Sequence, residues 1–151
     1  MTEAVAFPAL EPCEEALDDL SEWYYRQIHP TRVSDGTVDA EAFTPSQRDE
    51  RKLSGVRSSK QTARGAYEEY RRDFPNNPTA GTWGVTLEQV AKAKGRLVDD
   101  SQCPPPPGLA SWPTGHTYLD QRINDRGIRS KMRLTLARDA TNNGCQHAAS
   151  G

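Results

Sequence analysis

Side chains that build a hydrophobic core are scarce in this chain. Leu, Val, Ile and Phe together supply 23 of its 151 residues. A core becomes hard to assemble when these four types fall below about 20% of a sequence. The net charge is only −2, because 19 Lys and Arg residues nearly balance 21 Asp and Glu residues, so the strong charge excess of a disordered protein is missing. We therefore expect one compact centre with flexible N- and C-terminal tails.

Several function classes leave recognisable motifs, and this sequence carries none of them. It has no apolar run of the ~18 residues that span a membrane, no basic secretory start, and no common nucleotide, hydrolase or metalloprotease motif. Its three cysteines form no C-x-x-C pair, which favours reduced thiols. Cys145 and His147 are interpreted as chance neighbours rather than metal ligands. We expect a cytoplasmic protein with no metal, no cofactor and no membrane contact.

Charge and proline content divide the chain into segments. The first 22 residues carry seven acids and no base, whereas residues 121–151 have an excess of basic residues. The four prolines from Pro104 to Pro107 favour an extended spacer. The expected organisation is an acidic flexible arm at 1–15, a compact α+β core at 16–98, a Pro-rich connector at 99–113, a strand and basic helix packed on the core at 114–141, and a disordered tail at 142–151.

Local signals predict three main helices. Thr62 can cap a helix that Pro75 must end, and Thr86 with Gln89 fits a capping box. Ser130 can cap a third helix near the C-terminus. A short additional helix is expected at 16–20, and strands are expected at 23–28, 38–43, 53–56, 81–85 and 117–119. The prediction is an α+β fold with a small, mostly antiparallel sheet and three to four helices.

A set of short motifs resembles a family of small uncharacterised bacterial proteins that are common in actinobacteria. The motifs are R-Q-x-H-P at 26–30, A-F-x-P at 42–45, L-S at 53–54 and G-V-T at 84–86. The strand that starts at His116 resembles a later histidine-led strand of the same family. The resemblance implies a shared fold and a bacterial source, and it brings no established activity.

Arg26, His29 and Ser54 are the candidate catalytic residues. Arg26 offers a bidentate fork for a carboxylate or phosphate, and His29 titrates near neutral pH. A structural role is the alternative, because a histidine before Pro30 often caps a turn and Ser54 has no identified base. Arg26 and His29 on a first strand, Phe43 and Ser54 on later strands and then Glu68 or Glu69 on a helix form an order that resembles ADP-ribosyltransferase-like proteins. This resemblance would imply an enzyme that uses NAD or a nucleotide.

The basic segment near the C-terminus is a candidate surface for an anionic partner. It has no interleaved aromatic residues, so contact with nucleic acid would depend on phosphates alone. A solvated helix face is the alternative, and we also expect the acidic arm to compete weakly for this surface. We expect a small bacterial binding or accessory protein with a protein partner. The candidate binding residues are Arg122, Arg126, Arg129, Lys131 and Arg133.

Overall fold

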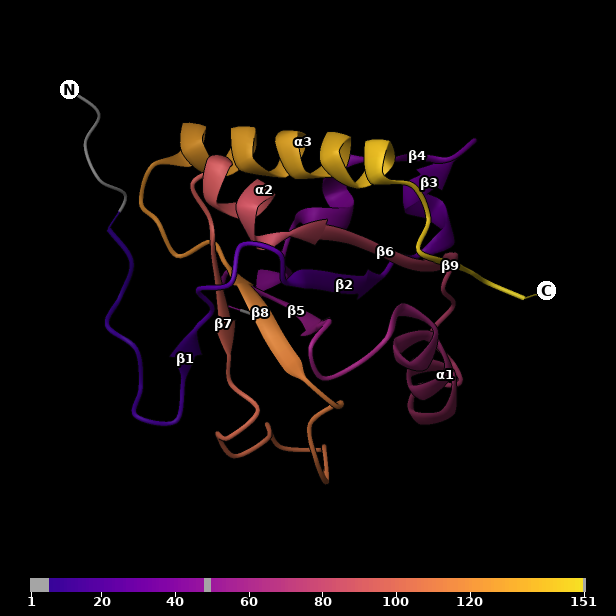
Figure 1. Cartoon of the computed structure of the whole chain (residues 1–151), viewed down its shortest axis with the longest axis horizontal. Helices are drawn as coiled ribbons and strands as arrows, with labels where there is room; N and C mark the ends of the chain where they lie inside the picture. The colour runs from indigo at the N-terminus through magenta and orange to yellow at the C-terminus, as the bar shows by residue number, and fades with distance from the viewer. Residues whose placement is uncertain (1–5, 48–49, 151) are drawn as a thin grey trace.

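The structure is a computed structural model that describes residues 6–47 and 50–150. One antiparallel sheet has the strand order β1-β7-β8-β5-β2-β6-β9, and a separate ribbon pairs β3 with β4 (Figure 1). The fold is α+β with a mostly antiparallel sheet, which confirms the predicted class. The strands are β1 Glu15–Ala16, β2 Trp23–Gln27, β3 Val33–Ser34, β4 Thr37–Val38, β5 Lys52–Arg57, β6 Gly81–Thr86, β7 Arg96–Asp99, β8 His116–Asp120 and β9 His147–Ala148.

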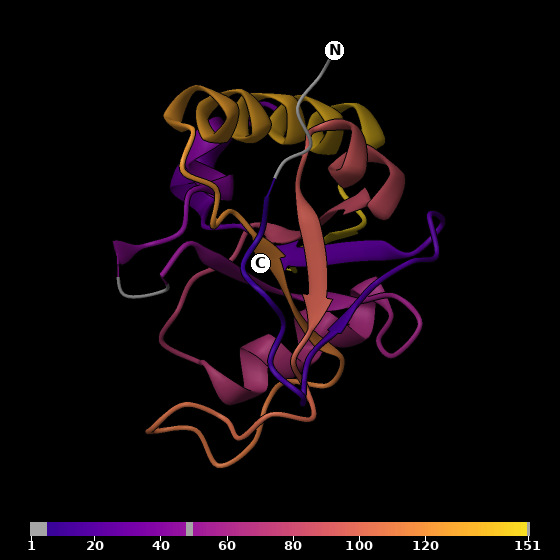
Figure 2. The same cartoon turned by 90° about the vertical axis from the view of Figure 1, so that its left-hand side faces the viewer.

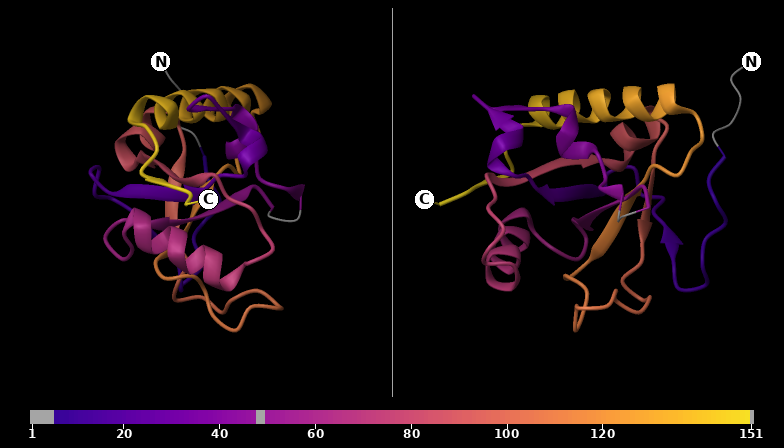
Figure 3. Two further views of the ribbon diagram at one scale, coloured as in Figure 1. Left: turned by 90° about the vertical axis from the view of Figure 1, so that its right-hand side faces the viewer. Right: turned by 180° about the vertical axis from the view of Figure 1, so that it is seen from behind.

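Helices cover both faces of the sheet. The α-helices are α1 Ala63–Asp73, α2 Leu87–Lys92 and α3 Arg126–Asn143, and two 3₁₀ helices are η1 Pro30–Arg32 and η2 Ala40–Phe43. The long α3 lies with α2 over one face, and α1 lies under the other, beside the loop that joins β7 to β8 (Figures 2 and 3). We call residues 100–115 the β7–β8 loop.

The scarce apolar residues are concentrated between the sheet and the α2–α3 layer. Tyr24 on β2 is almost fully buried there and donates its hydroxyl to Leu53 O at 2.5 Å. Burial raises the pKa of Tyr24 to about 12, although the nearby Arg26 acts in the opposite direction. The neutral phenol is therefore the form that the core holds. Other members of this core are Val85, Leu97, Leu119, Met132 and Leu136.

Two of the three predicted caps are present. Thr62 accepts a hydrogen bond from Gly65 N, and the Thr86–Gln89 capping box is complete. The third helix starts earlier than predicted, because Asp125 caps it by accepting from Ile128 N at 3.0 Å. Ser130 lies inside this helix, so its predicted role as a cap is wrong.

Several predictions of local structure are wrong because the residues pair in strands instead. The short helix expected at 16–20 is wrong, because Ala16 pairs with Val98 in the sheet. Strand structure in 38–43 is limited to Val38, and η2 follows it. Strands β7 and β9 were not predicted. The tail expected to be disordered contains the end of α3 and the β9 pairing with β6, up to residue 150. Residues 1–5 of the expected arm and residue 151 lie outside the described part.

A disulfide corrects the prediction of reduced thiols. Cys13 and Cys103 are bonded, with 90 residues between them in the sequence and Cα atoms 5.0 Å apart. Each cysteine lies just beyond the paired strands β1 and β7, and this pairing brings them together. Cys145 is a free, exposed thiol. In the described ranges, no helix is long and apolar enough to cross a membrane.

Candidate ligand-binding site

A cavity of about 280 Å³ lies on the α1 side of the sheet. We call it the Arg26 cavity. Strands β2 and β5 form its floor, α1 forms one wall and the β7–β8 loop forms the other. Most of its lining is apolar or aromatic. The residues that line it are Tyr25, Arg26, Gln27, Ser54, Gly55, Val56, Ala66, Glu69, Tyr70, Asp73, Phe74, Pro106, Leu109, Trp112, Pro113 and His116.

Arg26 lies where the sheet opens. Strands β2 and β5 are paired at Tyr24 and Tyr25, and the ladder between them ends there. The Arg26 side chain donates from Nη1 to Ser54 O of the neighbouring strand β5. Its Nε is buried and has no acceptor among the described residues. Arg26 also forms no ion pair within the described chain, so its charge is not neutralised.

The acidic side chains that line the cavity are already engaged. Glu69 accepts hydrogen bonds from Thr114 N and Thr114 Oγ1, both at 2.8 Å. Asp73 accepts from Arg72 Nε at 2.8 Å, and this bond lowers the pKa of Asp73. Neither carboxylate is paired with Arg26, so no carboxylate of the cavity lining neutralises this guanidinium in the described chain.

A buried His–Asp pair borders the same cavity. His116 Nδ1 lies 2.5 Å from Asp100 Oδ1, and His116 is only 4% exposed. The Trp112 ring stacks on His116 with ring centroids 4.1 Å apart. Trp112 Nε1 in turn donates to Cys103 O at 2.8 Å. The disulfide at Cys103 thus holds the loop that positions this aromatic wall.

Aromatic rings also form the opposite side of the cavity. Tyr70 and Phe74 of α1 pack with centroids 5.3 Å apart, and Tyr25 on β2 stacks on Trp23 at 6.0 Å. Burial raises the pKa of Tyr25, so its phenol stays neutral at physiological pH. The cavity therefore offers flat apolar faces around one cationic group, a combination suited to an anion that carries a planar ring.

The structure brings together two of the three candidate catalytic residues. Arg26 and Ser54 line the cavity together with His116. His29 lies elsewhere, exposed, where its Nδ1 accepts from Thr31 N and caps η1. Glu68 also points away from the cavity, in an exposed ion pair with Arg64. Ser54 has no hydrogen bond to a base in the described chain.

Sequence reasoning missed the contribution of the Pro-rich segment. It was predicted to be a spacer, but Trp112 supplies a cavity wall and Asp100 orients the histidine. A tryptophan between prolines, followed by a histidine-led strand, was the available signal. The pairing of Asp100 with His116 depends on the β7–β8 hairpin, which local patterns did not show.

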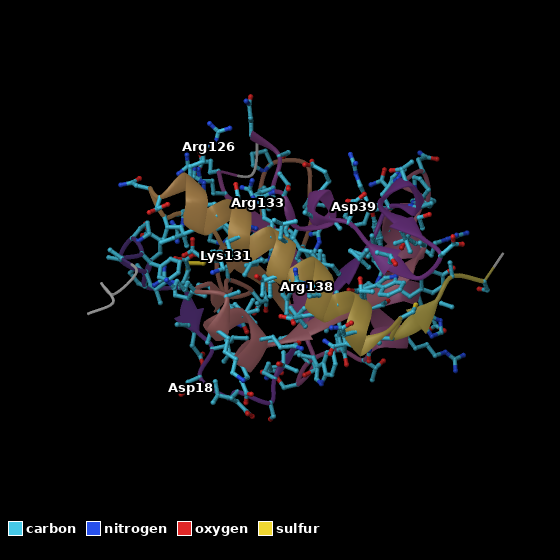
Figure 4. All side chains as sticks on the ribbon, turned by 90° about the horizontal axis from the view of Figure 1, so that it is seen from above. Asp18, Asp39, Arg126, Lys131, Arg133 and Arg138 are labelled. Atoms are coloured by element: carbon cyan, nitrogen blue, oxygen red, sulfur yellow. A yellow bond between two sulfur atoms is a disulfide. The ribbon has the colours of Figure 1, made fainter. Side chains whose placement is uncertain are left out.

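The basic residues occupy a different place. Arg122, Arg126, Arg129 and Arg133 line a polar groove beside η2, whereas Lys131 lines a separate hollow. Figure 4 shows Arg126 and Arg133 on the η2 side of α3, with Asp18 of the acidic segment across the helix.

Among the described ion pairs, none joins the acidic arm to α3. Glu14 of the arm instead accepts from the Tyr118 hydroxyl at 2.6 Å. Glu22, which follows the arm, binds Arg57.

No protein-family model, no curated protein and no solved structure matches this chain. The resemblance to small bacterial proteins therefore stays a prediction.

Proposed function

We propose that this chain is a binding module for a small anionic ligand that carries a planar ring. The observation behind the proposal is Arg26, a cation with a buried Nε that has no acceptor in the described chain. A buried donor without a partner costs free energy, and a buried charge costs more when it is unpaired. A carboxylate or phosphate that accepts from Arg26 would remove this cost.

The size and lining of the cavity define the rest of the ligand. Its volume of about 280 Å³ is slightly below the range for small-molecule sites, which is about 300–1,000 Å³. One ring with its anionic group fits this space. Trp112 and Tyr70 can cover the ring faces, and stacked pairs of this kind contribute about 0.5–1.5 kcal/mol beyond area burial.

The test compares probes that differ in charge. Benzoate and AMP should raise the melting temperature of the protein, because a ligand at 100 times its Kd adds about 2.7 kcal/mol to the free energy of unfolding. Benzamide and adenosine have no anionic group for Arg26 and should have little effect. Arg26→Gln should remove the difference between charged and neutral probes. Arg64→Gln changes the same charge at an exposed position of α1 and should not. Equal shifts with charged and neutral probes, or no shift with either anion, would contradict the proposal.

An enzyme that uses a nucleotide is the second candidate. The observation in its favour is that Arg26, Ser54 and the Asp100-oriented His116 border one cavity. A histidine held in this way can act as a general base. A complete dinucleotide is larger than the cavity, so the β7–β8 loop would have to move. Release of nicotinamide from NAD by the wild-type protein, and its loss in His116→Gln, would replace the binding-module proposal with this one.

For the compartment, we infer an oxidising environment in place of the expected cytoplasm. The Cys13–Cys103 disulfide supports this inference, because such bonds persist in secreted and periplasmic proteins and are rare in the cytosol. The bacterial source, the accessory role and the protein partner remain expectations from the sequence.

A further inference from the structure

A second site lies on the α3 side of the sheet, away from the Arg26 cavity. It is an open groove of about 690 Å³ between the first half of α3 on one side and residues 44–47, 50 and 51 on the other. We call it the arginine groove. Within the described residues, Glu50 is the one carboxylate of its lining. Five arginines line it: Arg51, Arg122, Arg126, Arg129 and Arg133.

Neutral oxygen atoms hold three of these arginines in place. Ile123 O accepts from Arg129 Nη1 at 2.5 Å and from Arg51 Nη1 at 3.3 Å. Arg133 Nε donates to Gln121 Oε1 at 2.8 Å. None of the three forms an ion pair within the part of the chain that the structure describes. Their guanidinium groups are therefore oriented without being neutralised.

A buried glutamine fixes the position of Arg133. Gln121 is fully buried, and its Nε2 donates to Phe43 O at 2.7 Å. This bond leaves Gln121 Oε1 as the acceptor that faces Arg133. Arg122 differs from the others, because its Nε donates to Asp120 Oδ1 at 2.9 Å in an ion pair.

The uncompensated charges repel one another. The pKa of Arg133 is lowered by burial and by the neighbouring Arg129 and Arg51, while Glu41 acts in the opposite direction. Like charges held close together by neutral acceptors are destabilising until a counter-ion arrives. An anion in the groove would reverse this repulsion, so the groove is organised before its ligand binds.

We propose that the arginine groove binds an anion with two or more phosphoryl groups, held by Arg51, Arg129 and Arg133. Arginine presents a planar fork that matches phosphate oxygens, and several arginines in one open groove exceed what a single phosphate needs. No aromatic residue lines the groove in the described chain. Stacking on bases is therefore not available, and recognition depends on the phosphoryl groups themselves.

The test is a calorimetric titration of the full chain with inorganic tripolyphosphate at low ionic strength. We expect saturable binding that weakens as salt is added, and much weaker binding of orthophosphate. Arg129→Gln and Arg133→Gln should each reduce the affinity by about 10- to 100-fold, the usual loss for one charge-assisted hydrogen bond. Arg126→Gln changes an exposed side chain of the same groove, so it provides a variant whose folding is not at risk.

Two substitutions on the same helix serve as matched controls. Lys131→Gln and Arg138→Gln remove the same charge from α3 outside the arginine groove, and both residues are exposed (Figure 4). We expect them to change the affinity less than threefold. If the control and groove variants weaken tripolyphosphate binding equally, the proposal is overturned, because the anion would then be attracted by the overall positive charge of α3 and not by a defined site. Failure to bind tripolyphosphate, or binding of oligouridine alone, would overturn it as well.

Discussion

Replacement of Cys13 and Cys103 with serine tests how far stability depends on the link between the N-terminal segment and the β7–β8 loop. The bond closes a loop of 90 residues in the unfolded chain. The chain-entropy relation for a loop of this length gives a stabilisation of about 4.6 kcal/mol at 25 °C. Small domains have a total stability of about 5–15 kcal/mol, so this one bond supplies a large share.

Chemical denaturation of the oxidised protein and of the double variant provides the assay. We expect the free energy of unfolding to fall by about 2–5 kcal/mol in the variant, the range found when native disulfides are removed from small domains. Cys145→Ser is the matched control, because this thiol is free and exposed. It should change the free energy of unfolding by no more than about 0.5 kcal/mol.

A thiol count decides whether the reasoning is correct. Unfolded but unreduced protein from an oxidising compartment should show one reactive thiol, from Cys145. Three reactive thiols would refute the disulfide and with it the inferred compartment. A double variant within 1 kcal/mol of wild type would refute the stability estimate, even if the bond is present.

Three further changes test the packing of the sheet. Arg57→Ala should cost about 3–5 kcal/mol in denaturation, because it leaves Glu22 and Asp99 partly buried without their cation. The pKa of each of these two carboxyls is lowered, since hydrogen bonds from neighbours including Arg57 outweigh the raising effect of burial. The stability that these two ionised carboxyls contribute is therefore fully present above their ordinary pKa values near 4 and is lost as the pH falls through their lowered pKa values in the folded protein. Urea titrations at pH 7 and pH 3 should show this loss. Gly55→Ala should lower the melting temperature, because a Cβ there would lie 2.4 Å from the Tyr24 ring.

Each of these predictions has an outcome that contradicts it. Arg64→Ala removes an exposed ion pair with Glu68 and should lower the free energy of unfolding far less than Arg57→Ala does. An equal loss in the two variants would indicate that burial is not the cause. Stability that does not change between pH 7 and pH 3 would contradict the lowered carboxyl pKa values. A Gly55→Ala protein as stable as wild type would show that both the Tyr24 ring and the Tyr25 carbonyl oxygen can move away from the new Cβ.

Helices α1 and α2 could be predicted from the sequence because their capping signals are local. Thr62 lies three residues from the amide that it caps, and Thr86 lies three residues from Gln89. Strand β7 could not be predicted in this way. Its two apolar residues, Leu97 and Val98, lie between an arginine and an aspartate. Asp99 can lie in the sheet because it forms an ion pair with Arg57 of β5.

The candidate site was only partly predictable for the same reason. Arg26 and Ser54 were chosen for their chemistry, and they meet because their strands are neighbours in the sheet. The Pro-rich segment was interpreted by its prolines, which describe backbone stiffness and not partners. The role of this segment depends on two contacts that its own sequence does not show. Cys103 is bonded to Cys13, which is distant in the sequence, and Trp112 stacks on His116, which belongs to β8.

The outermost strands of the sheet determine whether the protein can pair with copies of itself. Both β1 and β9 contain only two residues, and each covers a longer neighbour. An uncovered edge presents free N–H and C=O groups to which a second chain can add, which is a common start of aggregation. Gly81 lets β9 approach, since a Cβ there would lie 2.4 Å from His147 O. A side chain at Gly81 would therefore uncover β6 and make this edge of the sheet prone to pairing with another chain.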